Sequence, residues 1–413
     1  MAVRQKNYLW QNILNCLSMR SLFALALYVL LFSCNRDGRD PSGGRAPLTP
    51  NDQVVTAEGK KPLRLLSDRP PNLETPLHYF QADYTPNDVF FVRWHLAGLP
   101  TAVDTADFRL TVSGHVKKEL ALSLRDLRSL FKPYTLVALA QCAGNTRSFF
   151  DPRVPGGQWK NGGMGNAKWT GVKLKDILEM AGVKAGAREI SFNGLDEPPL
   201  PSVPDFVKSL RVDHAMDGEV MVAYSMNDEP LPLLNGFPLK LVVPGWYATY
   251  WIGMLSEIKV YPDSFKGFWM QKAYLVPKGV RNGNEHPDTL AKDMTPISKM
   301  DVRSVFVAPE PDSLLVKGRS YEIQGLAFDG GDGIVKVEVS PDSGKTWLTA
   351  RLDRDLGKYS WRRWRFAWTP RTEGKVVFKV KATNAAGETQ PPHQWNRSGY
   401  MRNEIETLEL EVR

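Results

Sequence analysis

The sequence predicts an α+β domain followed by an all-β sandwich of the immunoglobulin type. The chain has 413 residues, enough for two or three domains that each bury a core. Its hydrophobic fraction of 42% and charged fraction of 24% are ordinary for a globular protein and exclude a mostly disordered chain. Beyond Met300, mixed helical and extended patterns give way to short alternating strands. We therefore expect a first domain over residues 54–296 and a sandwich over residues 297–413.

The N-terminal segment is typical of a secretory signal. Arg4, Lys6 and Arg20 precede the apolar run 21–33, and no acidic residue occurs before Asp37. The run is shorter than the roughly 20 residues that span a bilayer. We therefore expect residues 1–33 to direct export and then to be removed.

A cysteine follows this run directly. The stretch Leu31-Phe32-Ser33-Cys34 resembles the bacterial lipobox, in which the cysteine receives a lipid after cleavage. Residues 34–53, rich in Gly, Asp, Arg and Pro, would then be a flexible tether that leads from a membrane anchor at Cys34. The alternative is an ordinary cleaved signal with an incidental cysteine. With either a lipobox or an ordinary cleaved signal, we expect the mature protein on the periplasmic side of the cell envelope.

Local signals mark elements in the first domain. Ser123 and Asp126 have the spacing of a capping box, which predicts a helix that begins after Ser123. Spacing of i, i+3, i+4 and i+7 predicts a second helix that Gly182 ends, with an apolar face of Leu174, Ile177, Leu178 and Ala181. The apolar run 237–244, bounded by prolines, predicts a buried strand.

Alternating apolar residues mark the strands of the second domain. Three such runs are Val335, Val337 and Val339; Val376, Phe378 and Val380; and Leu408, Leu410 and Val412. The stretch 341–344 reads as a hairpin turn. Four tryptophans are candidates for the core between the sheets: Trp347, Trp361, Trp364 and Trp368.

Charge and cysteine content narrow the classes of function. The net charge is +8 without any run of basic residues, which gives nucleic-acid binding little support and leaves an anionic substrate or an acidic partner open. Three cysteines are too few for a disulfide framework or an iron–sulfur cluster. No C-x-x-C-H sequence occurs, so we expect no covalently attached haem in this chain.

Cys142 is the candidate reactive residue, because the signal segment contains Cys16 and the anchor would use Cys34. It follows an apolar strand and precedes a Gly/Asn turn, and Arg147 nearby would favour the thiolate, the form that binds a metal. One alternative is a buried cysteine that packs as a small hydrophobe. A cysteine protease, which needs a partner histidine and an oxyanion hole, also stays open.

The segment around Cys142 also carries a family resemblance. Gln141-Cys-Ala-Gly-Asn145 strongly resembles the molybdenum-binding motif of the sulfite oxidase family of molybdopterin enzymes. The resemblance covers about residues 75–413, and the second domain is similar to the family's dimerisation domain. Further matching segments are 91–95, 166–171, 223–227, 235–238, 243–245 and 395–396. Within the family, the chain most resembles bacterial periplasmic sulfite dehydrogenases that pass electrons to cytochrome c.

The resemblance implies one molybdenum–molybdopterin cofactor per chain, with Cys142 as the only protein ligand to the metal. The implied cofactor-binding residues are Phe91, Arg93, His95, Cys142, Asn145, Asp196, Asn235, Lys240, Trp251 and Gly253. Vertebrate and plant members of the family have histidine and arginine where this chain has Asn235 and Lys240. The replacements keep the hydrogen-bonding and charge character of both positions.

The resemblance also implies a pocket for sulfite. Its residues would be Arg93, His95, Arg147, Tyr274 and Arg402, with Trp159 as a wall. Converging guanidinium groups suit a dianion. Arg397 competes with Arg402, because both follow the Trp395-Asn396 pair. The alternatives are surface ion pairs for the arginines, a hydrogen-bonded core residue for His95 and a packing aromatic for Tyr274.

The implied activity is oxidation of sulfite to sulfate, with electrons passed singly to a separate c-type cytochrome. The chain would act as a homodimer or as a heterodimer with that cytochrome. A related molybdenum enzyme acting on another small oxyanion or a sulfoxide is one alternative. A surface-anchored binding module without activity is another.

Overall fold

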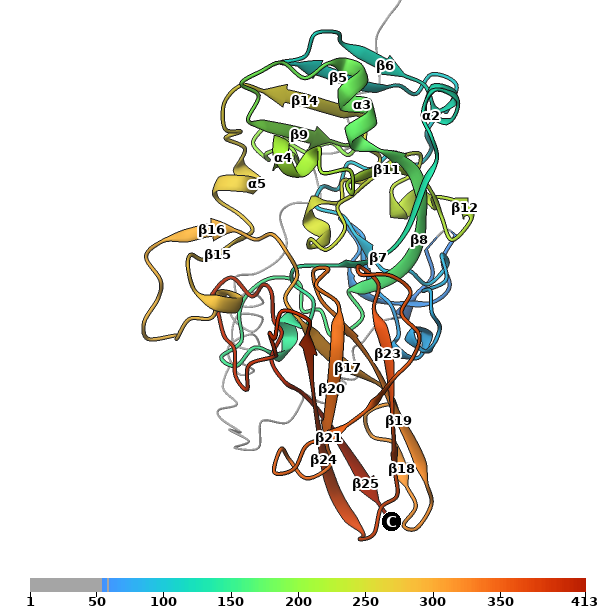
Figure 1. Cartoon of the computed structure of the whole chain (residues 1–413), viewed down its shortest axis with the longest axis vertical. Coiled ribbons are helices and arrows are strands. Elements are labelled where there is room, and N and C mark those ends of the chain that lie inside the picture. The colour runs from blue at the N-terminus through green and yellow to red at the C-terminus, as the bar shows by residue number, and fades with distance from the viewer. Residues whose placement is uncertain (1–53, 58) are drawn as a thin grey trace, which may run out of the picture. The chain divides into compact units, whose positions relative to one another are not determined.

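The computed structural model describes residues 54–57 and 59–413, which belong to one compact unit of the chain (Figure 1). The predicted signal, Cys34 and the predicted tether lie outside the described residues. Within the described part of the chain, no helix is both long and apolar enough to cross a membrane.

The first domain contains three sheets. The N-terminal sheet has the order β1 (Val54–Val55), β2 (Leu63–Ser67), β3 (Asn72–Glu74) and β4 (Val92–Arg93). The second has the order β10 (Lys208–Arg211), β9 (Glu189–Asn193), β14 (Glu257–Tyr261), β5 (Leu110–Gly114) and β6 (Leu120–Leu122). The third has the order β12 (Glu229–Pro230), β11 (Met221–Met226), β8 (Met164–Lys173) and β7 (Tyr134–Gln141), and β13 (Lys240–Val242) also pairs with β11. A small hairpin of β15 (Leu275–Pro277) and β16 (Met294–Pro296) follows.

Short helices connect these sheets. The capping box is confirmed: the Asp126 amide donates to Ser123 Oγ at 3.1 Å, and the Ser123 amide donates to the Asp126 carboxylate at 2.9 Å. The second predicted helix is also confirmed, and Gly182 ends it with φ of +67°. The α-helices are α2 (Leu124–Leu130), α3 (Leu174–Ala181), α4 (Val212–Ala215) and α5 (Phe268–Gln271). The 3₁₀ turns are η1 (Leu77–Gln81), η2 (Arg147–Phe149), η3 (Leu233–Asn235), η4 (Ala248–Tyr250) and η5 (Arg281–Gly283). The predicted strand 237–244 is shorter than expected, because only β13 within it pairs.

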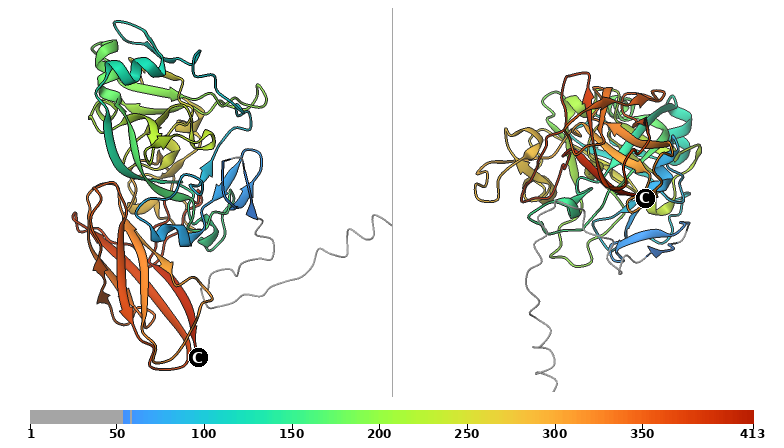
Figure 2. Two further views of the ribbon diagram at one scale, coloured as in Figure 1. Left: turned by 90° about the vertical axis from the view of Figure 1, so that its right-hand side faces the viewer. Right: turned by 90° about the horizontal axis from the view of Figure 1, so that it is seen from below.

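The second domain is the predicted sandwich of two sheets. One has the order β17 (Arg303–Ala308), β19 (Tyr321–Phe328), β23 (Arg362–Trp368) and β22 (Arg351–Leu352). The other has the order β18 (Leu314–Leu315), β25 (Glu406–Val412), β24 (Gly374–Asn384), β20 (Ile334–Ser340) and β21 (Leu348–Thr349). Figure 2 shows these strands, coloured orange to red, running alongside one another. The α+β domain with an immunoglobulin-like sandwich is therefore the observed fold class.

Three apolar residues of the sandwich differ from the predicted pattern. The pairing of β20 with β24 shifts register between Ile334 and Lys336, so Ile334 is buried and Val335 is 57% exposed. Trp347 is half-buried under the Lys381 ammonium rather than in the core. Trp361 packs edge-on against Phe80 of the first domain, with ring centroids 5.2 Å apart.

The sandwich contacts the loop that carries Cys142. The Met401 amide donates to the Ala143 carbonyl at 2.9 Å. Asn161, in the segment that follows this loop, donates to Glu406 at 2.8 Å and accepts from Arg303 at 2.6 Å. The end of the sandwich therefore helps to position the residues around Cys142.

Candidate active site

Cys142 is the first residue after β7, and local hydrogen bonds fix its loop. Its amide donates to the Gly163 carbonyl at 2.9 Å, and its carbonyl accepts from the Asn145 amide at 2.9 Å. Asn145 Oδ1 in turn accepts from the Gly163 amide at 2.9 Å. Thr146 has φ of +66°, so the chain turns sharply before Arg147. The result is a rigid loop in which Cys142 is only 7% exposed.

Two glycines leave room for the Arg147 guanidinium. A Cβ atom at Gly144 would lie 2.7 Å from Arg147 Nη2, and one at Gly156 would lie 2.8 Å from Nη1. Any side chain at either position would displace the guanidinium. The glycine of the Gly/Asn turn after Cys142 therefore leaves space for the Arg147 side chain.

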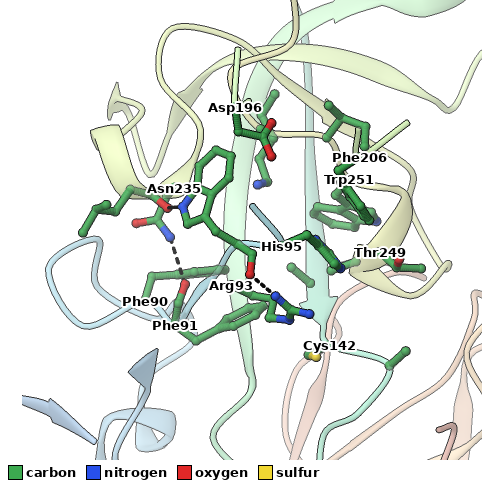
Figure 3. Close-up of a pocket in the computed structure, with 18 of the residues that line it drawn as sticks. Phe90, Phe91, Arg93, His95, Cys142, Asp196, Phe206, Asn235, Thr249 and Trp251 are labelled. Carbon is green, nitrogen blue, oxygen red and sulfur yellow. Dashed lines mark hydrogen bonds between the residues drawn. The ribbon is translucent and has the colours of Figure 1, made fainter. Parts of the chain in front are cut away.

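A cavity lies beside Cys142 (Figure 3). Nine of the ten residues implied to bind the cofactor line it: Phe91, Arg93, His95, Cys142, Asp196, Asn235, Lys240, Trp251 and Gly253. The tenth, Asn145, does not line the cavity. Its side chain accepts a hydrogen bond from the Gly163 amide and so stabilises the Cys142 loop.

The polar groups of this cavity fit a polar, anionic guest such as molybdopterin. Asp196 Oδ2 is buried without a hydrogen-bond partner among the described residues, and burial raises the pKa of Asp196 to about 7. Lys240 forms no ion pair within the described chain, and burial lowers its pKa to about 8. Unpaired buried polar groups are costly, so a ligand with N–H donors and a phosphate would satisfy them.

A second cavity shares Arg93, Cys142 and Tyr274 with the first. Its remaining lining residues are Leu66, Ser67, Asn72, Gly144, Arg147, Pro155, Gly156, Gly157, Trp159, Trp269, Ser398 and Tyr400. The lining thus includes two arginines and no carboxylate. Cys142 lies at the junction of a cavity suited to a cofactor and a cavity suited to an anion.

Neutral groups hold both arginines. Arg147 Nε donates to the Gly399 carbonyl at 3.0 Å, and Nη1 donates to the Gly157 carbonyl at 3.1 Å. Arg93 donates to Asn72 Oδ1 at 3.2 Å, to the Trp94 carbonyl and to the Tyr274 hydroxyl at 3.3 Å. Neither pairs with a carboxylate in the described part of the chain, so the alternative of surface ion pairs does not hold. Their positive charges are available to an anion.

His95 and Tyr274 form a hydrogen-bonded pair between the cavities. His95 Nε2 bonds the Tyr274 hydroxyl, and its ring stacks on Phe206 at a centroid distance of 3.4 Å. Burial, with help from Arg93 and Lys208, lowers the pKa of His95 well below its usual value. Burial raises the pKa of Tyr274. The pair is therefore a neutral imidazole and a protonated phenol.

The structure adds two residues that the sequence reasoning missed. Tyr400 stacks on Tyr274 at 5.0 Å, and its ring lies under the Arg147 guanidinium at 4.9 Å. Lys208 is fully buried, donates to the Trp269 carbonyl at 2.7 Å and lies 5.2 Å from the Tyr274 ring centroid. Burial lowers the pKa of Lys208 to about 7. Tyr400 lies between Arg397 and Arg402 in the sequence, whereas no sequence signal marks Lys208.

Arg402 lies outside both cavities, contrary to the expectation that it reaches the substrate pocket. Its guanidinium points to two carboxylates, with Nη2 at 3.1 Å from Glu404 and Nη1 at 3.7 Å from Glu406. Arg397 also lies outside the cavities and pairs with Glu285 at 3.3 Å. The attraction of these carboxylates explains both placements. The sandwich contributes Ser398 and Tyr400 to the second cavity instead.

Replacing Arg402 by alanine is therefore expected to lower stability rather than substrate affinity. Loss of the guanidinium leaves Glu406, which is 2% exposed, without one of its cationic neighbours, at a cost of roughly 3 kcal/mol in the free energy of unfolding. Urea denaturation and steady-state kinetics with sulfite check this. A KM for sulfite raised ten-fold at unchanged stability would show that Arg402 does reach the substrate.

Comparison with known proteins defines the class. Residues 96–269 match the oxidoreductase molybdopterin binding domain, and residues 294–410 match the Mo-co oxidoreductase dimerisation domain. Human mitochondrial sulfite oxidase is 33% identical over 86% of this chain and 69% of its own length. Sulfite oxidase of Arabidopsis thaliana is 31% identical over 82% of this chain and 91% of its own. The fold is also similar to the sulfane dehydrogenase SoxCD of Paracoccus pantotrophus, with a TM-score of 0.72 at 26% identity, covering 91% of this chain and 92% of that one.

The two matched domains show that the chain is a molybdopterin oxidoreductase. It belongs to the sulfite oxidase family. The family interpretation made from the Cys142 motif is confirmed, and the cysteine-protease alternative is overturned.

Proposed function

We propose that this protein oxidises sulfite to sulfate at Cys142, with a bound molybdenum–molybdopterin cofactor. The observation that carries the proposal is the second cavity, which presents Arg93 and Arg147 and no carboxylate beside the Cys142 thiol. Sulfite is largely a dianion near neutral pH, and guanidinium groups bind such an ion through charge-assisted hydrogen bonds.

One cofactor per chain would supply the oxygen transfer and take up the electron pair, with Cys142 Sγ as the protein's ligand to the metal. Asp196, Asn235 and Lys240 would hold the organic part of the cofactor in the first cavity. These three residues offer a carboxyl, an amide and an ammonium group there. Their polar character matches a pterin edge and a phosphate.

The chain's own residues would bind and orient the substrate. Arg93 and Arg147 orient sulfite, and the indole of Trp159, only 2% exposed, closes one side of the cavity. The hydrogen bond between His95 Nε2 and the Tyr274 hydroxyl would keep both groups oriented where the two cavities meet. The overall change is that sulfite and water give sulfate, two electrons and two protons.

A separate c-type cytochrome is the proposed electron acceptor. The sequence has no C-x-x-C-H site for a covalently attached haem, which favours an acceptor on a separate protein. The match to a dimerisation domain supports assembly as a homodimer or as a heterodimer with the cytochrome.

The test is a set of turnover assays on the full chain, purified with its cofactor. Sulfite is expected to reduce cytochrome c, whereas nitrate and methionine sulfoxide are not reduced when a reduced viologen dye supplies electrons. A compound with sulfane sulfur is the fourth substrate tested, because a protein of known structure with a similar fold is a sulfane dehydrogenase. Turnover of any of these three in place of sulfite would reassign the substrate.

The periplasmic, lipid-anchored location is a further part of the proposal, supported by the lipobox-like stretch that ends at Cys34. Wild-type protein is expected to sediment with membranes, and Cys34→Ser is expected to be soluble or unprocessed with unchanged kinetics. Fractionation of cells that express both forms checks this. Equal solubility of the two forms in the periplasmic fraction would rule out the anchor.

A further inference from the structure

A buried lysine lies beside the cofactor cavity without lining it. Lys60 is 6% exposed, and its ammonium donates to the Asn87 carbonyl at 2.7 Å, to the Phe90 carbonyl at 3.1 Å and to Asn235 Oδ1. An ammonium has three hydrogens, so these three acceptors use all of them. Lys60 precedes the segment 96–269 that matches the molybdopterin-binding domain.

The contact with Lys60 fixes the orientation of the Asn235 amide. Its Oδ1 accepts from Lys60, and its Nδ2 donates to the Phe91 carbonyl at 2.9 Å, the bond drawn beside Asn235 in Figure 3. A flipped amide would turn Nδ2 toward the ammonium and Oδ1 toward a carbonyl, so it is excluded. Nδ2 makes only this bond among the described residues, which leaves its second hydrogen for a ligand. Asn235 can therefore act as a hydrogen-bond donor to a guest in the cavity.

Among the described residues, no carboxylate forms an ion pair with Lys60. Asp88 is the carboxylate that acts on it through space, but Asp88 pairs with Lys61 at 2.8 Å. Burial lowers the pKa of Lys60 to about 7, and repulsion from Lys240 adds to this effect. An approaching anion would favour the ammonium form of both Lys60 and Lys240, and neither is paired with a carboxylate in the described chain. A buried cation is costly unless an anion approaches it.

We propose that Lys60 is a positioning residue for the cofactor. It holds the Asn235 amide as a donor and, together with Lys240, attracts the anionic phosphate of molybdopterin. The inference rests on the cofactor assignment made above and is independent of the substrate.

The test compares Lys60→Met with Lys61→Met. Methionine keeps the length of the side chain without its charge, and the control removes an exposed lysine one position away. Molybdenum and pterin are measured per chain after timed dialysis of each full-length protein. We expect Lys60→Met to lose the cofactor roughly 10- to 100-fold faster than wild type, the effect typical of outer-shell partners of a metal site, and Lys61→Met to match wild type.

The melting temperature of the cofactor-free protein, produced in cells that cannot make molybdopterin, separates this role from a purely structural one. We expect Lys60→Met to melt close to wild type, because removal of a buried charge offsets the loss of its three hydrogen bonds. A second variant, Lys60→Gln, keeps a hydrogen-bond donor and is expected to retain the cofactor better than Lys60→Met.

A double-mutant cycle with Asn235→Ala tests whether Lys60 acts through Asn235. The two substitutions are expected to be non-additive in the rate of cofactor loss, because each disables the same contact. Equal retention in wild type and Lys60→Met, or additive effects in the cycle, would overturn the inference. Absence of cofactor from wild type would instead overturn the proposed function.

Discussion

Replacing Cys142 by serine is expected to abolish sulfite oxidation and leave the fold intact. Serine nearly matches the shape of cysteine, so the loop bonds to Gly163 and Asn145 persist. A hydroxyl is a harder and much weaker ligand than a thiolate, which changes the electronics of the metal. Turnover assays with circular dichroism on both proteins measure the two parts of this expectation.

X-ray absorption at the molybdenum edge adds a readout that does not depend on activity. One sulfur ligand fewer is expected in Cys142→Ser than in wild type. An unchanged sulfur count, or more than a few per cent of wild-type turnover, would show that Cys142 does not bind the metal.

Replacing Arg147 by methionine is expected to reduce kcat/KM for sulfite about 10- to 150-fold. Loss of one charge-assisted contact to a desolvated dianion costs roughly 1.5–3 kcal/mol. Arg147 holds this position through the Gly399 and Gly157 carbonyls, and methionine keeps the bulk of the side chain without those bonds. Steady-state kinetics with sulfite measure the effect.

Arg153→Met is the matched control for this prediction. Arg153 is exposed on the same loop and donates to Gln158 at 3.0 Å, so its loss is expected to change kcat/KM by less than two-fold (about 0.4 kcal/mol). An equal effect of both substitutions would mean that the general charge of the loop, rather than a contact in the cavity, governs sulfite binding.

Much of the fold follows from signals that act locally. The capping box at Ser123 and the left-handed glycine at Gly182 satisfy the ends of their own helices, so neighbours in the sequence suffice to predict them. Val335 shows the limit of such patterns, because a register shift in the pairing with β24 turns it to solvent. Trp361 shows another limit: the surface that buries it belongs to the other domain.

The candidate site also contains residues that a local motif predicts and residues that only the folded structure reveals. Cys142 and Arg147 share one loop, so a single motif brings them together. Lys60 and Lys208 resemble ordinary surface lysines in the sequence, and only tertiary packing shows that both are buried beside the site. Arg402 was expected in the pocket by its place in a motif, but nearby carboxylates turn it away.

The central claim is that Cys142 binds a molybdopterin cofactor between the two cavities. Molybdenum and pterin analysis of the purified full chain tests it most directly. We expect one molybdenum and one pterin for each chain of wild type. A wild-type protein that contains neither, after expression in cells supplied with molybdate, would contradict the claim.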